Sequence, residues 1–210
     1  MESSLIWKKL NIQKERIVTS LEIKGLAKEI GNNEDRAIAY LQEEGYIVRI
    51  LRGIFYVRTP DEKMRKGLDR SLFELVGMAL VKKGVKEWYF GLDTALRLNG
   101  MTHEYHDITH VLTDSFRTTK PIMIGGSRFS FVRRNKRFFG FGMKEEKNYH
   151  YSDPERTILD LAYYAYLHGK VENRIKESLV EYGGDLNQER LCDYLHRYPK
   201  RYIRILKGMK

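Results

Sequence analysis

The sequence predicts an α+β fold in two parts: a winged helix-turn-helix over residues 1–60, followed by a mixed α+β domain over residues 61–210. Two observations predict the first part, namely apolar residues at helical spacing separated by a Gly-Asn turn, and two β-prone segments joined by a glycine. A proline at position 60 and a charged run after it mark the boundary.

The helix-turn-helix is expected between residues 19 and 44. Thr19-Ser20-Leu21-Glu22 has the capping-box pattern of a helix start, and apolar side chains then recur on one helical face. Gly31-Asn32-Asn33 ends this helix, and Asn33 can cap the next one, Glu34 to Glu44. Polar side chains of the second helix gather opposite its apolar face: Asn32, Asn33, Arg36 and Tyr40.

Residues 46–57 are expected to form a hairpin, the wing, with a short turn ending at Gly53. Asn, Arg and Tyr side chains can bond to base edges in the major groove, and Arg49 and Arg52 of the wing can neutralise phosphates. The pattern therefore predicts a double-stranded DNA-binding domain. Because Asp35, Glu43 and Glu44 make the helix less basic, a protein-interaction adaptor is an alternative.

The second part is expected to be a mixed domain with antiparallel strands and a helical C-terminal end. Turns at Gly125-Gly126 and around Asn135 suggest an antiparallel meander, and Ser152 to Glu155 suggests a second capping box. Strands are expected at 88–90, 108–113, 122–124 and 129–132, and helices at 68–80, 92–99, 155–168, 171–182 and 187–197, with a basic turn at 201–207.

The chain has a formal net charge of +10 and a single cysteine. One cysteine excludes an intramolecular disulfide and a multi-cysteine zinc site, which favours a cytoplasmic location. Cys192, between leucines of an expected helix, is interpreted as a small packing residue. No stretch approaches the ~18 apolar residues of a membrane span, so no membrane partner is expected.

Positive charge concentrates in the middle of the sequence, where no acidic residue occurs between Asp114 and Glu145. Phe129 and Phe131 share one face of an expected strand and should lie in the core, which leaves the basic residues on the other face and at the turn. We expect a secondary nucleic-acid contact, or otherwise a solvated positive surface, at Arg128, Arg133, Arg134, Lys136 and Arg137.

Other candidate sites are weaker. His103, His106 and His110 fit no zinc spacing, so no metal is assigned, although a metal-dependent nucleic-acid enzyme using them is a second hypothesis. Gly125-Gly126-Ser127 resembles the Gly-Ser motif of nucleotidyltransferases but is interpreted as a turn. The acids Asp153, Glu155 and Asp160 are interpreted as capping and ion-pairing groups beside Arg156, so no catalytic residue is assigned.

Five segments, in order, carry a resemblance to a known family: "LRGIFYV" from residue 51, "YFGLDTALRLNGMT" from 89, "ITHVLTD" from 108, "RFFGF" from 137 and "YSDPERTILDLAYY" from 151. This order resembles the AbiEi antitoxin family of type IV toxin-antitoxin loci, and the run Ser152 to Thr157 is its most specific part.

The resemblance implies a repressor that autoregulates its own operon through the N-terminal domain. It further implies that the C-terminal domain counteracts a nucleotidyltransferase toxin without stable binding, and that the protein has no enzymatic activity and no cofactor. A repeated operator would engage two chains, because each chain has one winged helix; a monomer and a dimer on DNA both remain open.

Overall fold

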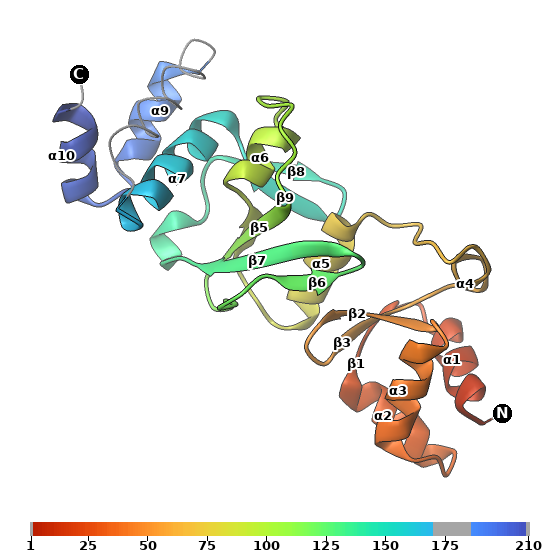
Figure 1. The fold of residues 1–210 in the computed structure, drawn as a ribbon. Helices are drawn as coiled ribbons and strands as arrows, with labels where there is room; N and C mark the ends of the chain where they lie inside the picture. Colours follow the sequence, from red (N-terminus) through yellow and green to blue (C-terminus); the bar gives the residue numbers. More distant parts are fainter. Residues whose placement is uncertain (1, 170–185, 209–210) are drawn as a thin grey trace. The chain divides into compact units, whose positions relative to one another are not determined.

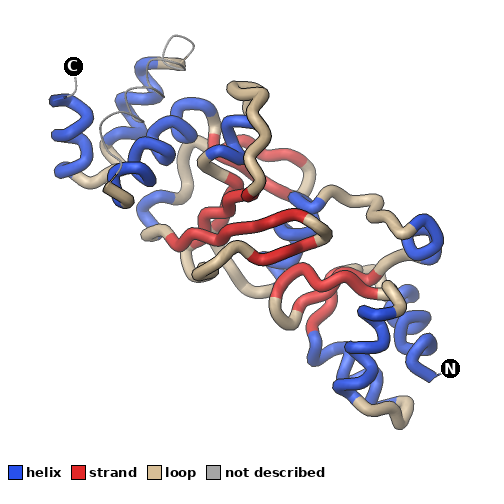
Figure 2. Tube along the Cα trace, viewed as in Figure 1, coloured by secondary structure: helices blue, strands red, loops and turns tan. Residues whose placement is uncertain are grey.

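The structure, a computed structural model, describes residues 2–169 and 186–208 and divides the chain into two compact units. The first unit comprises Met1–Val85 and Met123–Gly126, and the second comprises Lys86–Ile122 and Ser127–Lys210. Each unit combines helices with a sheet, so the α+β class is confirmed (Figures 1 and 2). The expected boundary after residue 60 differs from this division, because the first unit continues through two more helices.

The first unit contains the winged helix (Figure 1). Its three strands pair antiparallel in the order β1-β3-β2, and β2 and β3 form the hairpin of the wing. Its elements are α1 (Glu2–Ile12), β1 (Ile17–Thr19), α2 (Ser20–Glu29), α3 (Glu34–Glu43), β2 (Ile47–Leu51), β3 (Ile54–Val57), α4 (Pro60–Arg65) and α5 (Leu72–Lys82).

Local hydrogen bonds set the helix-turn-helix as the sequence predicts. The Glu22 carboxylate accepts the Thr19 amide at 2.6 Å, which completes the capping box of α2. Gly31 has a φ of 72°, a conformation that favours glycine, and the Asn32 amide then donates to the Ala27 carbonyl at 2.9 Å. Asn33 caps α3 by accepting the Arg36 amide at 3.0 Å.

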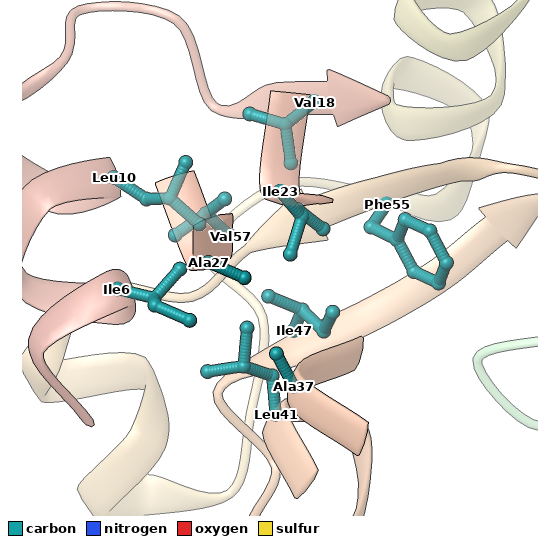
Figure 3. Packing of buried hydrophobic residues seen from close by; sticks show 10 residues of the cluster. All are labelled: Ile6, Leu10, Val18, Ile23, Ala27, Ala37, Leu41, Ile47, Phe55 and Val57. Atoms are coloured by element: carbon teal, nitrogen blue, oxygen red, sulfur yellow. The ribbon is translucent and has the colours of Figure 1, made fainter. Parts of the chain in front are cut away.

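Helices α1, α2 and α3 bury their apolar faces against one side of the sheet (Figure 3). Helical spacing places Ile23 and Ala27 on the inner face of α2, and Ala37 and Leu41 on that of α3. The buried side chains of this core are Ile6, Leu10, Val18, Ile23, Ala27, Ala37, Leu41, Ile47, Phe55 and Val57.

The other side of this sheet is covered by α5, which contacts all three strands. Every residue of β3 is buried, and alternate side chains of a strand point to opposite faces. Phe55 and Val57 belong to the core under the three helices, so Ile54 and Tyr56 face the side that α5 covers. The wing is therefore part of a layer packed on both faces.

A buried carboxylate links α4 to this layer. Thr59 and Glu62 form a second capping box, with Pro60 in the first turn of the helix. Glu62 is fully buried, and it accepts the Tyr56 hydroxyl at 2.9 Å and the Asp69 amide at 2.7 Å. Burial, together with the neighbouring Glu62 carboxylate, raises the pKa of Tyr56 to about 12.

The second sheet has the strand order β6-β7-β5-β4-β9-β8. The expected antiparallel meander is wrong in part, because β5 pairs parallel with β7 and β4 pairs parallel with β9. Since β6 intervenes between β5 and β7 in the chain, β7 returns in the direction of β5. The strands are β4 (Trp88–Phe90), β5 (Ile108–Thr113), β6 (Ile122–Ile124), β7 (Ser127–Arg133), β8 (Met143–Glu146) and β9 (Tyr149–Ser152).

The helices of the second unit are α6 (Asp93–Leu98), the short 3-10 helix η1 (Lys136–Phe138), α7 (Pro154–Leu167), α9 (Gln188–Leu195) and α10 (Lys200–Gly208). The expected helix at 171–182 lies outside the described residues. The interpretation of Cys192 as a packing residue is wrong, because its side chain is exposed on α9. Leu191 and Leu195 occupy the inner face of this helix, and Cys192 lies ~100° away from Leu191.

Candidate nucleic-acid interface

The first turn of α3 presents two of the expected base-contacting residues to solvent. Arg36 and Asn33 are both exposed. Asn33 uses its side-chain oxygen as the helix cap, so its amide nitrogen is the group that it can offer to a ligand. This turn is where a recognition helix commonly contacts bases.

The other two expected residues of this face, Asn32 and Tyr40, are half-buried. The ring of Tyr40 lies 6.1 Å from that of Tyr46, and partial burial raises the pKa of Tyr40. Tyr46 is itself held by Trp7, at 4.7 Å between rings, and by the Lys63 ammonium, 3.3 Å from its ring centroid. Tyr40 therefore belongs to an aromatic cluster at the margin of the face, which its helical spacing alone does not predict. Asn32 lies in the turn before α3.

One acidic residue of α3 is neutralised within the helix-turn-helix. Lys24 of α2 pairs with Asp35 at 2.6 Å, and this partner raises the pKa of Lys24. Glu34 and Glu43 remain as exposed acids of α3. The helix surface is thus mixed in charge, with its one arginine at the N-terminal end.

The wing carries its two arginines at exposed positions. Arg49 lies on β2, and Arg52 lies in the two-residue turn that ends at Gly53. The Ser20 amide donates to the Gly53 carbonyl at 2.8 Å, which ties the turn to the start of α2. This hydrogen bond fixes the backbone of the turn that carries Arg52.

The basic segment of the second unit separates into three places. Phe129 and Phe131 are buried, as expected from their period of two. Arg128 is paired with Asp107 at 2.7 Å, and the Arg137 guanidinium lies 5.0 Å from the Phe138 ring centroid. A cleft of about 520 Å³ contains the three other expected cations and a fourth cation, Arg117, that the expected contact does not include. Its lining is Asp114, Arg117, Arg133, Arg134, Asn135 and Lys136.

The most specific motif of the resemblance is buried. Arg156 is 0% exposed, its guanidinium lies 3.9 Å from the Tyr89 ring centroid, and it donates to the carbonyls of Phe138 and Phe141. Its Nε lies 3.4 Å from the Asp160 carboxylate, which confirms the expected ion pair.

The Asp160 carboxylate also receives two hydroxyls, from Tyr89 at 2.8 Å and Tyr198 at 2.7 Å. Burial and the Asp160 charge raise the pKa of both tyrosines. This network joins β4, α7 and the chain before α10, so it holds the second unit together.

The expected capping box at Ser152 and Glu155 is wrong, because Asp153 is the cap of α7 and accepts the Arg156 amide at 2.9 Å. The Ser152 hydroxyl instead lies 2.7 Å from that of Thr157, and Glu155 accepts the Asn187 amide at 2.9 Å. These acids have structural partners, as the sequence interpretation expected in general terms.

The three histidines do not gather at one place, although, besides burial, the charge of His106 contributes to lowering the pKa of His110. His103 is exposed, whereas His110 is largely buried on β5, and burial lowers its pKa. Its nearest carboxylate is Asp93, 3.8 Å away. Within residues 2–169 and 186–208, no three or more His, Cys, Asp or Glu side chains are grouped so that they could hold a metal ion. Gly125 and Gly126 form the expected turn.

No helix in the part of the chain that the structure describes is long and apolar enough to cross a membrane. No family model matches the chain, and no curated protein matches it. The crystal structure of the RV2827C protein from Mycobacterium tuberculosis is similar, with a TM-score of 0.56 and 14% sequence identity over 99% of this chain and 75% of that chain. At this identity the similarity shows a shared α+β fold and nothing about function.

Proposed function

We propose that this protein is a DNA-binding transcriptional repressor of the antitoxin type. The observation that carries the DNA-binding role is a helix-turn-helix with an exposed first turn of α3, followed by a wing with two exposed arginines. Arg36 supplies a fork of donors suited to guanine, and Arg49 and Arg52 supply charge for the flanking phosphates.

The antitoxin role rests on the resemblance of the five segments to the AbiEi family. On that basis the protein autoregulates its operon and counteracts a nucleotidyltransferase toxin. Co-expression with such a toxin, encoded beside its gene, should restore growth, and Arg36→Ala should abolish repression while leaving this protection intact.

A gel-shift experiment tests the DNA-binding role with the duplex upstream of the gene and a random duplex at moderate salt. Arg36→Ala should reduce the discrimination between the two by about 1–3 kcal/mol, because it removes the base contact. Lys28→Ala is the matched control, since Lys28 is an exposed lysine of α2 outside this face and the charge change is the same. Equal binding of the wild-type protein to both duplexes would refute a sequence-specific repressor.

A protein-interaction adaptor is a second candidate, favoured by the exposed Glu34 and Glu43 on α3. An adaptor would bind both duplexes weakly, and Arg36→Ala would leave DNA binding unchanged.

A further inference from the structure

The cleft in the second unit gathers positive charge without an equivalent countercharge. We call it the basic cleft; its lining contains four cations, Arg117, Arg133, Arg134 and Lys136, and one carboxylate, Asp114. Its volume of about 520 Å³ lies within the range of about 300–1,000 Å³ that is usual for ligand sites.

The pairing of β5 with β7 builds this cleft. The two strands are parallel neighbours, with Thr113 opposite Arg133, so both strands end at the same edge of the sheet. The Arg134 amide donates to the Thr113 carbonyl at 2.8 Å. Arg117 approaches because Thr118, next in the chain, donates its amide to Phe131 of β7 at 3.0 Å. The carboxyl ends of parallel strands are a common place for ligands.

Arg134 is the residue that most needs an anion. Its Nε and Nη2 are buried and have no hydrogen-bond partner in the described structure, and its guanidinium lies 5.6 Å from the Tyr163 ring centroid and 5.7 Å from that of Tyr164. Ring faces stabilise a cation only partly, and a buried charged donor left unpaired is costly. Because these two nitrogens are closed to solvent, an anion in the cleft would offset the charge of Arg134 through space and would bond to the exposed cations around it.

The cations of the basic cleft form no ion pair with another described residue, although Arg133 Nε donates to the Asp114 carbonyl at 3.3 Å. Among the ion pairs formed by described residues, none includes Arg117, Arg133, Arg134 or Lys136, although Arg128 pairs with Asp107. Arginine forks match the oxygens of phosphate, and the lining contains no aromatic ring on which a base could stack.

We propose that the basic cleft binds phosphate groups, either of a polynucleotide backbone or of a nucleotide, without reading base sequence. This site uses residues distinct from those of the winged helix, so it does not depend on the proposed repressor function. Its signature is an affinity that falls with salt and is indifferent to sequence.

Fluorescence anisotropy with a labelled single strand of random sequence tests this site in the full-length protein. Replacing the exposed pair Arg117→Gln and Lys136→Gln should weaken binding about tenfold and should make the slope of log K against log salt shallower by about 1.4. The matched control, Arg97→Gln with Lys200→Gln, removes the same charge from exposed positions of the same unit outside the cleft, and should change the affinity less than twofold.

Arg134→Gln should weaken binding as well, and if this half-buried position prevents folding, the exposed double variant still decides. A competition experiment with ATP distinguishes a nucleotide from a polynucleotide as the source of the phosphate. If ATP displaces the labelled strand at a lower concentration than unlabelled strand does, and if this displacement is lost in the cleft variants, the ligand is a nucleotide. Equal weakening by the control pair, or equally tight cleft-dependent binding of polyglutamate, would overturn the proposal. Every cleft variant should still discriminate the operator from a random duplex. A negative result for the cleft therefore leaves the proposed repressor function standing, and a negative result for the repressor leaves the cleft standing.

Discussion

The two units use arginine in opposite ways. In the second unit, Arg156 is the centre of the most conspicuous motif of the sequence and is completely buried among rings, carbonyls and Asp160. In the first unit, Arg36 is part of no conspicuous motif, but it is exposed at the start of the helix that would read DNA. The comparison teaches that a distinctive charged motif can serve folding, whereas the candidate recognition surface is found from helix geometry.

The largest effect is expected at Arg156. Arg156→Met removes the cation and leaves the Asp160 carboxylate buried beside two tyrosine hydroxyls, which should destabilise the second unit by about 3–5 kcal/mol. Urea unfolding followed by circular dichroism measures this loss. Arg128→Met, which breaks the exposed pair with Asp107, is the control and should cost no more than ~1 kcal/mol. An Arg156→Met protein as stable as wild type would break the contrast.

An intermediate effect is expected from alkaline pH in the first unit. The pKa of Tyr56 is raised to about 12, so between pH 10 and that value the folded state keeps a proton that the unfolded chain releases. The stabilising effect is complete below pH 10 and falls by up to about 1.4 kcal/mol per pH unit above it.

Unfolding free energies measured across this alkaline range should show a shallower decline for Tyr56→Phe than for the wild type. Tyr194 of the second unit, whose pKa is also raised to about 12, contributes equally to both proteins. Parallel pH profiles for the two proteins would show that the Tyr56–Glu62 contact does not carry the effect.

The smallest change in stability separates capping from recognition at Asn33. Asn33→Ala should cost about 1 kcal/mol, because it removes the cap of α3, whereas Asn33→Asp keeps a good cap. Both variants should weaken operator binding, since the amide donor is lost and aspartate adds a negative charge toward phosphate. Thermal melting and gel shifts measure the two properties; Asn33→Asp binding DNA like wild type would exclude Asn33 from the interface.

Local signals predicted the elements that local hydrogen bonds define. The Thr19–Glu22 box, the Gly31 turn and the Asn33 cap are confirmed, because each is set by residues a few positions apart. The same capping-box pattern occurs at Thr59 and Glu62, where it starts α4 inside the expected boundary region, so this helix could also have been predicted from the sequence. Strand β1 has three residues, too few to show a period.

Features that depend on distant segments were not predictable. The parallel direction of β5 and β7 depends on how the chain crosses between them, and the spacing of residues within each strand does not record it. The basic cleft follows from that pairing, because it brings Arg117 beside Arg133 and Arg134, and the sequence interpretation grouped cations only by their proximity in the chain. Likewise, helical spacing alone puts Tyr40 on the outer face, because its packing partner Tyr46 lies beyond the end of the helix.

The discontinuity of the first unit limits how this protein can be taken apart. Residues 123–126 belong to that unit although 37 residues of the other unit precede them in the chain, and an ideal Cβ at Gly125 would lie 2.6 Å from Leu72 of α5. The φ of Gly125 is +55°, so glycine suits both the turn and this close approach. A fragment ending at residue 60 would expose the apolar face that α5 covers, and one ending at 85 would lack the contact at Leu72. The first unit is therefore not encoded by one continuous segment, and transferring it to another protein would require two separate pieces of chain.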